Sequence, residues 1–345
     1  MCQSRDMATS SSSTSSPPAP TLPCLVFDYG DDQNPATLFS VSGAARRACE
    51  IEELRGKRRS WPTAHGWVLA WDPDTTATFL WKWDPRAAAA DRIPLPALPQ
   101  PPPPWRSVCA LSGSPTAAGG AGCTVLLAAP PESGGVLWYC HAGGAAAPAW
   151  GRHEYDPGGG DGAEKGPYMS CSIGLVSCRG RFYYCHSPTE CGVIDFSPAG
   201  PPALGTVPME SVPLLCVEGC AGAAADMSTV VEIDGELYVV SVFFHGTDFD
   251  TVADVGVYRK DLGRREHVRV ESIGDRAILA GSGGRSLGRW CPATEFGLLP
   301  NSVYWMSAFD RRLHVFDIEL GTEQVRDIAM AVLDISSASI NIYTN

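Results

Sequence analysis

The chain has 345 residues, of which 44% are hydrophobic, and its formal net charge is −12 with a pI near 5.0. This acidic balance disfavours nucleic acid as an obligate partner, because phosphate binding requires a basic surface. No apolar run reaches the roughly 18 residues that a membrane span needs, so we expect neither nucleic acid nor membrane as a partner.

The N-terminal segment 1–21 consists mostly of Ser, Thr, Pro and Ala. It is expected to be disordered, because it holds too few large apolar side chains to offset the entropy lost on ordering. A plastid transit peptide is also Ser-rich and poor in acids, but this segment carries Asp6 and a single arginine, Arg5. We therefore expect a cytoplasmic or nuclear protein, with plastid or mitochondrion as the alternative address.

From Leu22 the sequence becomes a series of short apolar runs separated by turn residues, which is typical of β-strands. In the first half of the chain these runs are 22–30, 36–41, 65–72, 77–85, 123–130 and 135–142. The charged segment 44–58 has sparse apolar positions and predicts a short turn or helix, and the basic patch Arg55 to Arg59 is expected to form a solvated turn after it. The proline-rich segment 94–104 predicts an extended or exposed connector.

The second half of the chain contains further apolar runs, namely 172–178, 181–186, 192–197, 228–233, 236–244, 254–261, 266–273, 277–281, 302–308 and 313–319. Arg179-Gly180 and Asp234-Gly235 are expected to be two-residue hairpin turns, since glycine supplies the positive φ that such turns need. Polar turns followed by aromatic-bearing strands recur about every forty to fifty-five residues, the scale of a propeller blade. The pattern predicts an all-β fold, an irregular β-propeller, with a β-sandwich as the alternative.

The 13 cysteines do not resemble a disulfide framework, because their number is odd and no secretory signal precedes them. Many lie inside apolar runs, as do Cys140 and Cys185. We expect buried, reduced thiols in an intracellular protein.

One pentapeptide, Gly284-Arg285-Ser286-Leu287-Gly288, matches the G-x-S-x-G pattern of a serine hydrolase. That chemistry needs a strand-to-helix turn, whereas Pro292 and Gly297 follow and leave no helix start. The downstream acids and histidine, Asp310, His314 and Asp317, lie on expected hairpin strands. A flexible inter-strand loop with Arg285 and Arg289 exposed is favoured, and the serine hydrolase is the alternative.

Possible metal and phosphate ligands are present without the spacing that such sites require. Zinc ligands pair two to four residues apart, unlike Cys171, Cys178, Cys185, Cys191 and His186, and the pair Cys216 and Cys220 has no second pair beside it. The loop 281–284 lacks the lysine of a phosphate-binding loop, and His245, Asp248 and Asp250 lack the calcium-loop pattern. We assign no catalytic, cofactor-binding or metal residue.

Four tryptophans lie close together in sequence, namely Trp67, Trp71, Trp81 and Trp83. Trp81 and Trp83 would share one face of a strand and could form an aromatic wall for a ligand. Packing between strands is favoured, because indoles bury large apolar areas.

The phrases LPCLVFDYG, TAHGWVLAWD, VLWYCHAG, DGELYVV, RVESIGDRAILAGSG and CPATEFGLLPNSVYWMS resemble the plant DUF295 family, also described as the KIB1-4 β-propeller family, and most of all its grass branch. The resemblance extends from Leu22 to about Val325. It implies a propeller of degenerate kelch-like blades over 22–328 and carries no catalytic residue with it. Many relatives bear an N-terminal F-box that binds a Skp-type adaptor, with the propeller as the presumed target-binding module of a ubiquitin ligase.

This sequence departs from its relatives at both ends. Residues 1–20 cannot supply the helices of an F-box, which makes direct adaptor binding doubtful. The C-terminal segment 329–345 diverges from the usual ending and is expected to close the ring poorly. The resemblance therefore implies a non-enzymatic scaffold that binds another, unidentified protein.

Overall fold

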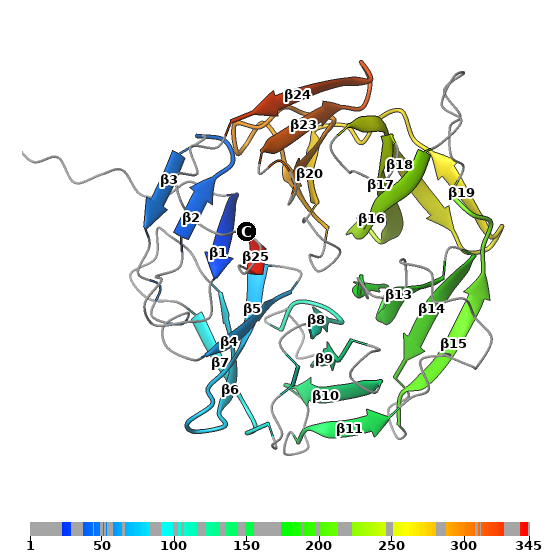
Figure 1. Ribbon diagram of the computed structural model, residues 1–345. Coiled ribbons are helices and arrows are strands. Elements are labelled where there is room, and N and C mark those ends of the chain that lie inside the picture. Colours follow the sequence, from blue (N-terminus) through cyan, green and yellow to red (C-terminus); the bar gives the residue numbers. More distant parts are fainter. Residues whose placement is uncertain are drawn as a thin grey trace, which may run out of the picture.

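The structure is a computed structural model that describes residues 23–28, 37–43, 45–48, 51, 53, 58–63, 66–82, 91–98, 103–104, 107–115, 122–130, 135–143, 149–154, 174–187, 189–196, 201–212, 223–245, 251–280, 288–307, 310, 312–327 and 339–343. Within these residues, six sheets stand around a common axis (Figure 1). The fold is therefore an all-β propeller, as the sequence predicted, and not a sandwich of two sheets. No helix in the described part of the chain is long and apolar enough to cross a bilayer.

Each sheet is one blade, with its strands ordered from the axis outward. The first three blades are β25 (Ser339–Tyr343), β1 (Cys24–Asp28), β2 (Thr37–Ser40) and β3 (Ala45–Ala48); β4 (Arg59–Pro62), β5 (Trp67–Trp71), β6 (Thr78–Lys82) and β7 (Asp91–Leu95); and β8 (Val108–Leu111), β9 (Cys123–Ala128), β10 (Val136–Ala142) and β11 (Gly151–Glu154). The last three are β12 (Val176–Cys178), β13 (Arg181–Ser187), β14 (Glu190–Asp195) and β15 (Ala203–Pro208); β16 (Ala223–Ile233), β17 (Glu236–His245), β18 (Val252–Asp261) and β19 (Glu266–Arg269); and β21 (Arg289–Pro292), β20 (Arg276–Ala280), β22 (Ser302–Met306), β23 (Leu313–Asp317) and β24 (Thr322–Arg326).

The hydrophobic core lies between the blades. The buried apolar side chains of the described residues form six clusters, and each cluster joins two neighbouring blades. Strand β5 shows the cause: Trp67, Leu69 and Trp71 face the third blade, whereas Val68 and Ala70 face the first. Since side chains alternate along a strand, one apolar run supplies two interfaces.

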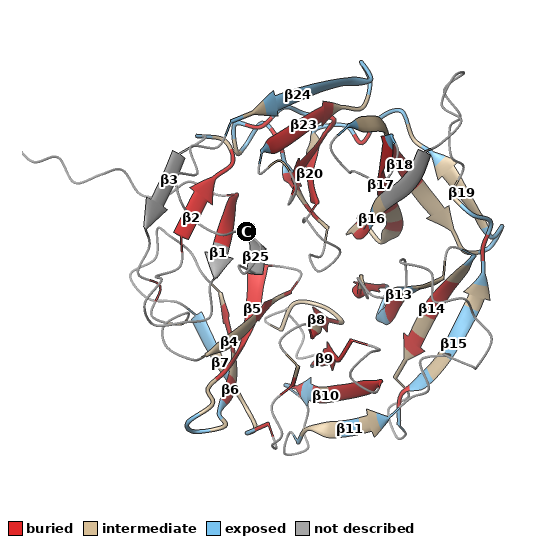
Figure 2. Cartoon of the chain, in the orientation of Figure 1, coloured by how far each residue is buried: buried red, intermediate tan, exposed pale blue. Residues whose placement is uncertain are grey.

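In the second to sixth blades, whose rim strands are described, burial falls from the middle of the blade to its rim (Figure 2). All five residues of β22 are buried, whereas four of the five residues of β24 are exposed. A rim strand has no neighbour on its far side, so polar side chains such as those of β24 are tolerated there.

One segment differs from the sequence-based expectation, whereas the segment 94–104 is extended as expected where it lies in β7. Part of the segment 44–58, which was expected to form a turn or helix, is strand β3, because Ala45–Ala48 pairs with β2 at the rim of the first blade. The expected connector 94–104 begins inside β7, where Pro94 lies opposite Phe79 on the outermost strand. An edge strand tolerates proline, since one side of it needs no backbone donor.

The ring is closed by the two ends of the described chain. Strand β25 lies antiparallel to β1, with Cys24 opposite Tyr343 and Asp28 opposite Ser339. In Figure 1 the C-terminal strand is the innermost one of the first blade. The expectation that 329–345 closes the ring poorly is therefore wrong for residues 339–343, because this strand covers an edge of β1 that would otherwise be open.

Three strand glycines lie beneath tyrosine rings. In the fourth blade, Gly192 is opposite Tyr184, and a Cβ at position 192 would come within 2.1 Å of the Tyr184 ring. Tyr139 over Gly151 repeats this cross-strand arrangement, and the ring of Tyr258 lies over Gly256 two residues away on the same strand. A glycine here allows the ring to lie flat against the backbone of the sheet.

We expect Gly192→Ala to lower the melting temperature by about 1–5 °C, because overpacking of this kind costs about 1–3 kcal/mol. Gly205→Ala on the neighbouring strand β15 is the matched control, since no atom lies within 4 Å of its added Cβ. Thermal unfolding of both variants followed by circular dichroism checks this. Equal melting temperatures for the two variants would contradict the explanation.

Candidate functional site

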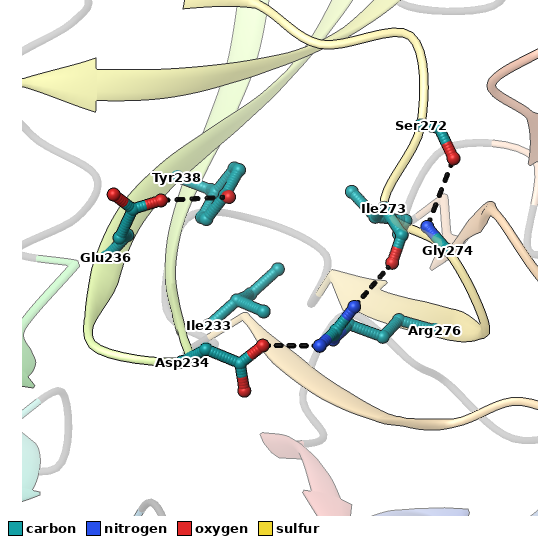
Figure 3. Close-up of a pocket in the computed structure, with 8 residues that line it drawn as sticks. All are labelled: Ile233, Asp234, Glu236, Tyr238, Ser272, Ile273, Gly274 and Arg276. Carbon is teal, nitrogen blue, oxygen red and sulfur yellow. Dashed lines mark hydrogen bonds and ion pairs between the residues drawn. The ribbon is translucent and has the colours of Figure 1, made fainter.

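A polar pocket of about 280 Å³ lies where the fifth and sixth blades meet (Figure 3). Its lining comes from the β16–β17 turn, the start of β17, the crossing between the two blades and the start of β20. The residues are Ile233, Asp234, Glu236, Tyr238, Ser272, Ile273, Gly274 and Arg276.

One wall of the pocket is the tight turn at Asp234-Gly235. Both residues have positive φ, 52° and 81°, so the predicted two-residue hairpin turn is confirmed. The turn is held from the fourth blade by Cys178, whose Sγ lies 3.2 Å from the carbonyl oxygen of Gly235. Directly after the turn, Glu236 accepts a hydrogen bond from the Tyr238 hydroxyl at 3.4 Å and lies 3.6 Å from Nη1 of Arg259.

The opposite wall is the crossing 271–275 from β19 to β20. Asn301, just before β22, holds this crossing in place. Its side-chain Oδ1 accepts a hydrogen bond from the backbone N–H of Ile273 at 2.9 Å. Its backbone N–H donates to the carbonyl oxygen of Gly274 at 3.0 Å. The amide of Gly274 donates to Oγ of Ser272 at 3.1 Å. A crossing bonded at three places is a firm wall rather than a loose loop.

Arg276 joins the two walls. Its Nη2 forms an ion pair with Asp234, and its Nη1 donates to the carbonyl of Ile273 at 2.9 Å. The guanidinium also lies over the ring of Trp290, 5.3 Å from its centroid. Its Nε is buried and has no hydrogen-bond partner among the described residues. The terminal nitrogens and one face of the Arg276 guanidinium are therefore used in contacts within the protein.

The pocket offers a charged, partly apolar surface, in which each carboxylate has an arginine beside it. Two carboxylates, Asp234 and Glu236, and one guanidinium line it, and the side chains of Asp234 and Glu236 are 59% and 42% exposed. Burial, followed by the nearby charge of Glu236, raises the pKa of Tyr238, which keeps its hydroxyl protonated as a donor. Such a set of groups is suited to recognition of a polar side chain.

The serine pentapeptide lies mostly outside the described residues, since 281–287 are not among them. Its last glycine is described. A Cβ on Gly288 would lie 2.7 Å from Cγ2 of Thr229, so this position needs glycine for close approach to β16. The next element is strand β21, whereas a nucleophile elbow needs a helix there.

Arg289 does not lie where the sequence suggested. It was expected to be exposed, but it is buried, with 6% relative exposure, on the innermost strand of the sixth blade. The sequence carried no sign of this burial, because β21 has no apolar alternation.

His314 is the histidine that follows the pentapeptide in the sequence, and both of its ring nitrogens are occupied. Nδ1 lies 2.6 Å from Oε1 of Glu323, and Nε2 lies 2.8 Å from Oδ2 of Asp310. Two ionised carboxylates as acceptors favour the form of the ring that carries two N–H donors, the imidazolium, and their hydrogen bonds and charges raise the pKa of His314 against the effect of burial. It stacks on Trp305 with ring centroids 4.9 Å apart. In this arrangement neither nitrogen is open to a serine hydroxyl.

The other candidate ligands are dispersed. Cys178 is buried, Cys185 is exposed on β13, and Cys191 is buried on β14, whereas Cys171 lies outside the described residues. His186 lies 3.7 Å from Glu190. The part of the chain that the structure covers holds no group of three or more His, Cys, Asp or Glu residues placed to bind a metal.

Several further candidates fall on residues that are not described, namely Cys216, Cys220, Asp248, Asp250, 281–284, Arg285 and Trp83. The described tryptophans Trp67, Trp71 and Trp81 are buried, which confirms the packing interpretation for these three. Of the basic patch, Arg58 pairs with Asp72 at 3.3 Å and Arg59 donates to the carbonyl of Pro103.

Sequence reasoning identified the Asp234-Gly235 turn but not the pocket beside it. Arg276 and Asp234 are 42 residues apart, and only the packing of two blades brings them together. The weak signals that pointed here are an acid within a tight turn and an arginine immediately before an apolar strand.

Comparison with known proteins assigns the family. The sequence model of the KIB1-4 beta-propeller family matches residues 38–330. No curated protein matches the chain. A solved structure of a mutant of AofleA from Arthrobotrys oligospora resembles it with a TM-score of 0.33 and 8% sequence identity, covering 90% of this chain and 84% of that one. The family match extends over most of the chain, which therefore belongs to the KIB1-4 β-propeller family.

Proposed function

We propose that this KIB1-4 propeller is a non-enzymatic scaffold that recognises another protein, in a role similar to that of the target-recognition propellers of plant F-box proteins. The observation that carries the proposal is the pocket between the fifth and sixth blades, where exposed charged groups stand on a firm framework. Binding groups presented on rigid elements need little ordering when a partner arrives.

The surroundings of the pocket support a recognition role. Its walls are two-residue turns and short crossings rather than long loops, and core clusters fix the blades on either side. The exposed side chains of Asp234 and Glu236 project from this framework (Figure 3). Charged groups at the rim of an interface mainly direct association and specificity.

The alternative is a serine hydrolase that uses Ser286. The strand after the pentapeptide and the two carboxylates on His314 favour the scaffold. Incubation of the full chain with a fluorophosphonate probe separates the two functions. We expect no labelling at Ser286, and the same background in Ser286→Ala, with a known serine hydrolase as the positive control. Stoichiometric labelling that disappears in Ser286→Ala would overturn the scaffold proposal.

A further inference from the structure

Strand β24 is the outermost strand of the sixth blade, which has five strands where the other blades have four (Figure 1). Figure 2 shows that β24 is exposed, whereas the neighbouring strand β23 is mostly buried. An edge strand makes backbone hydrogen bonds on one side only, and its other side meets solvent. Side-chain contacts with the blade therefore matter for holding β24 in place.

Glu323 provides a polar contact between β24 and the interior of the blade. Its Oε1 lies 2.6 Å from Nδ1 of His314, whose side chain is 6% exposed. Within the described part of the chain, Glu323 has no other hydrogen-bond partner. The ion pair of Arg312 with Asp327, just after β24, joins side chains that are 52% and 84% exposed, so it contributes little. The contact of Glu323 with His314 is therefore the main polar side-chain contact that holds the strand.

Asp310, the second carboxylate on the ring, is held more firmly than Glu323. Its Oδ2 lies 2.8 Å from Nε2 of His314, and its Oδ1 accepts a hydrogen bond from the backbone N–H of Arg312 at 2.9 Å. Its own backbone N–H donates to Oγ of Ser307 at 3.3 Å. These bonds fix Asp310 in the turn between β22 and β23. A change in the ring is therefore expected to move Glu323 rather than Asp310.

The number of N–H donors on the ring depends on its protonation. The imidazolium has two donors, one for each carboxylate, whereas the neutral ring has one N–H and one lone pair. A neutral ring that keeps its N–H toward Asp310 presents the lone pair to the Glu323 oxygen 2.6 Å away, which is a repulsive contact. Glu323 can relieve this repulsion by turning into solvent, because its side chain is already 28% exposed.

The surroundings of His314 leave its charge under the control of these two carboxylates. Strand β22 contributes the ring of Trp305, and the fifth blade faces this side of the sheet with an apolar cluster. Glu236 and Arg259 of the fifth blade lie by the start of β20, whereas Trp305 is paired with the last residue of that strand. Burial alone would lower the pKa of His314, but the hydrogen bonds and charges of the two carboxylates raise it.

We propose that His314 is a pH-sensitive latch for β24: the doubly protonated ring holds the strand on the sixth blade, and loss of one proton releases Glu323 and loosens the strand. The proposal is independent of the scaffold function. Because the native pKa is raised, the latch is closed below about pH 6.5 and opens as the pH rises through the native pKa of His314. The opening is local, since only the rim strand is released.

Hydrogen–deuterium exchange of the full chain from pH 6 to pH 9, followed by mass spectrometry, tests the latch. Exchange times are scaled for the dependence of intrinsic exchange on pH. We expect the protection of peptides that cover 322–326 to fall about fivefold across this range, the size of one partly exposed ion pair. Peptides that cover β7, a rim strand without histidine, should keep their protection.

Glu323→Gln removes the carboxylate from the exposed strand. Protection of β24 in this variant should already be low at pH 6 and should stay constant toward pH 9. Glu266→Gln is the matched control, because it makes the same substitution on the rim strand β19, where Glu266 pairs with Arg264 at 3.6 Å. It should show the wild-type fall in β24. Circular dichroism of each variant checks that the fold is kept.

Three results would each overturn the proposal. The first is wild-type protection of β24 that stays the same from pH 6 to pH 9. The second is a fall that Glu323→Gln retains. The third is an equal fall in the β7 peptides, which would indicate loosening of the whole ring rather than of one strand. None of these results bears on the scaffold function, which the fluorophosphonate probe tests separately.

Discussion

A chain that ends at Ala338 is expected to melt about 5–10 °C below the full-length protein. This truncation removes β25, which pairs with β1 at five register positions. Backbone hydrogen bonds contribute about 1 kcal/mol each, so several kcal/mol are lost, and each shifts the melting temperature of a protein of this size by about 1–2 °C. The exposed edge of β1 should also promote association between chains. Differential scanning calorimetry measures the first effect and light scattering the second.

Two controls isolate the strand. A chain that ends at Tyr343 loses only Thr344 and Asn345, and a chain that lacks residues 1–21 loses only the N-terminal segment; neither should change the melting temperature. Addition of a synthetic peptide of residues 329–345 to the shortened chain should restore part of the lost stability. A shortened chain that melts with the full-length protein would show that β25 does not hold the ring.

Replacement of His314 by glutamine should lower the free energy of unfolding at pH 6 by about 2–3 kcal/mol. Removing one member of a buried ionic group costs about 3–5 kcal/mol, and Asp310 and Glu323, which are 25% and 28% exposed, reduce that cost. The imidazolium bridges these two carboxylates and stacks on Trp305, so the substitution removes two charge-assisted hydrogen bonds and a ring contact. Denaturant unfolding of both proteins measures the difference.

The same contribution should depend on pH. Burial alone would lower the pKa of His314, but the hydrogen bonds and charges of Glu323 and Asp310 outweigh it, so the native pKa is raised. Stability from a raised pKa is fully present below the unfolded value of about 6.5 and is lost as the pH rises through the native pKa. The gap between wild type and His314→Gln should therefore shrink from pH 6 to pH 9.

His153→Gln on the outer strand β11 is the control for this pH series, since it makes the same substitution on an outermost strand. It should follow the wild type at every pH. A gap for His314→Gln that stays constant across the series would mean that His314 stabilises the blade by packing rather than by charge.

The middle strands of the blades were predictable from sequence because each is buried on both faces. Every residue of β5 is apolar and buried. Strand β17 begins after the tight turn at Asp234-Gly235, which the glycine in the sequence predicted. The rim strands β3 and β24 were not predicted; four of the five residues of β24 are exposed, so no apolar pattern is required there. A strand that is buried on both faces needs a run of apolar residues, and such a run can be recognised in the sequence.

The candidate site was less predictable than the fold. The Asp234-Gly235 turn was visible in the sequence, but its role as a pocket wall depends on Arg276 from the next blade. His314 was visible only as a possible partner of Ser286, and its engagement by Glu323 depends on the pairing of β23 with β24. Contacts between separate strands leave no local signal.

The sequence by itself determined that this chain is a series of short strands and tight turns, and that its tryptophan-rich runs pack inside, because alternation and turn chemistry are local properties. Only the tertiary structure decided that β25 returns to β1, that Arg289 is buried, and that two carboxylates and an arginine from adjacent blades form one pocket. These features arise from the closure of a ring, in which residues far apart in the chain become neighbours because each blade buries its two faces against the next.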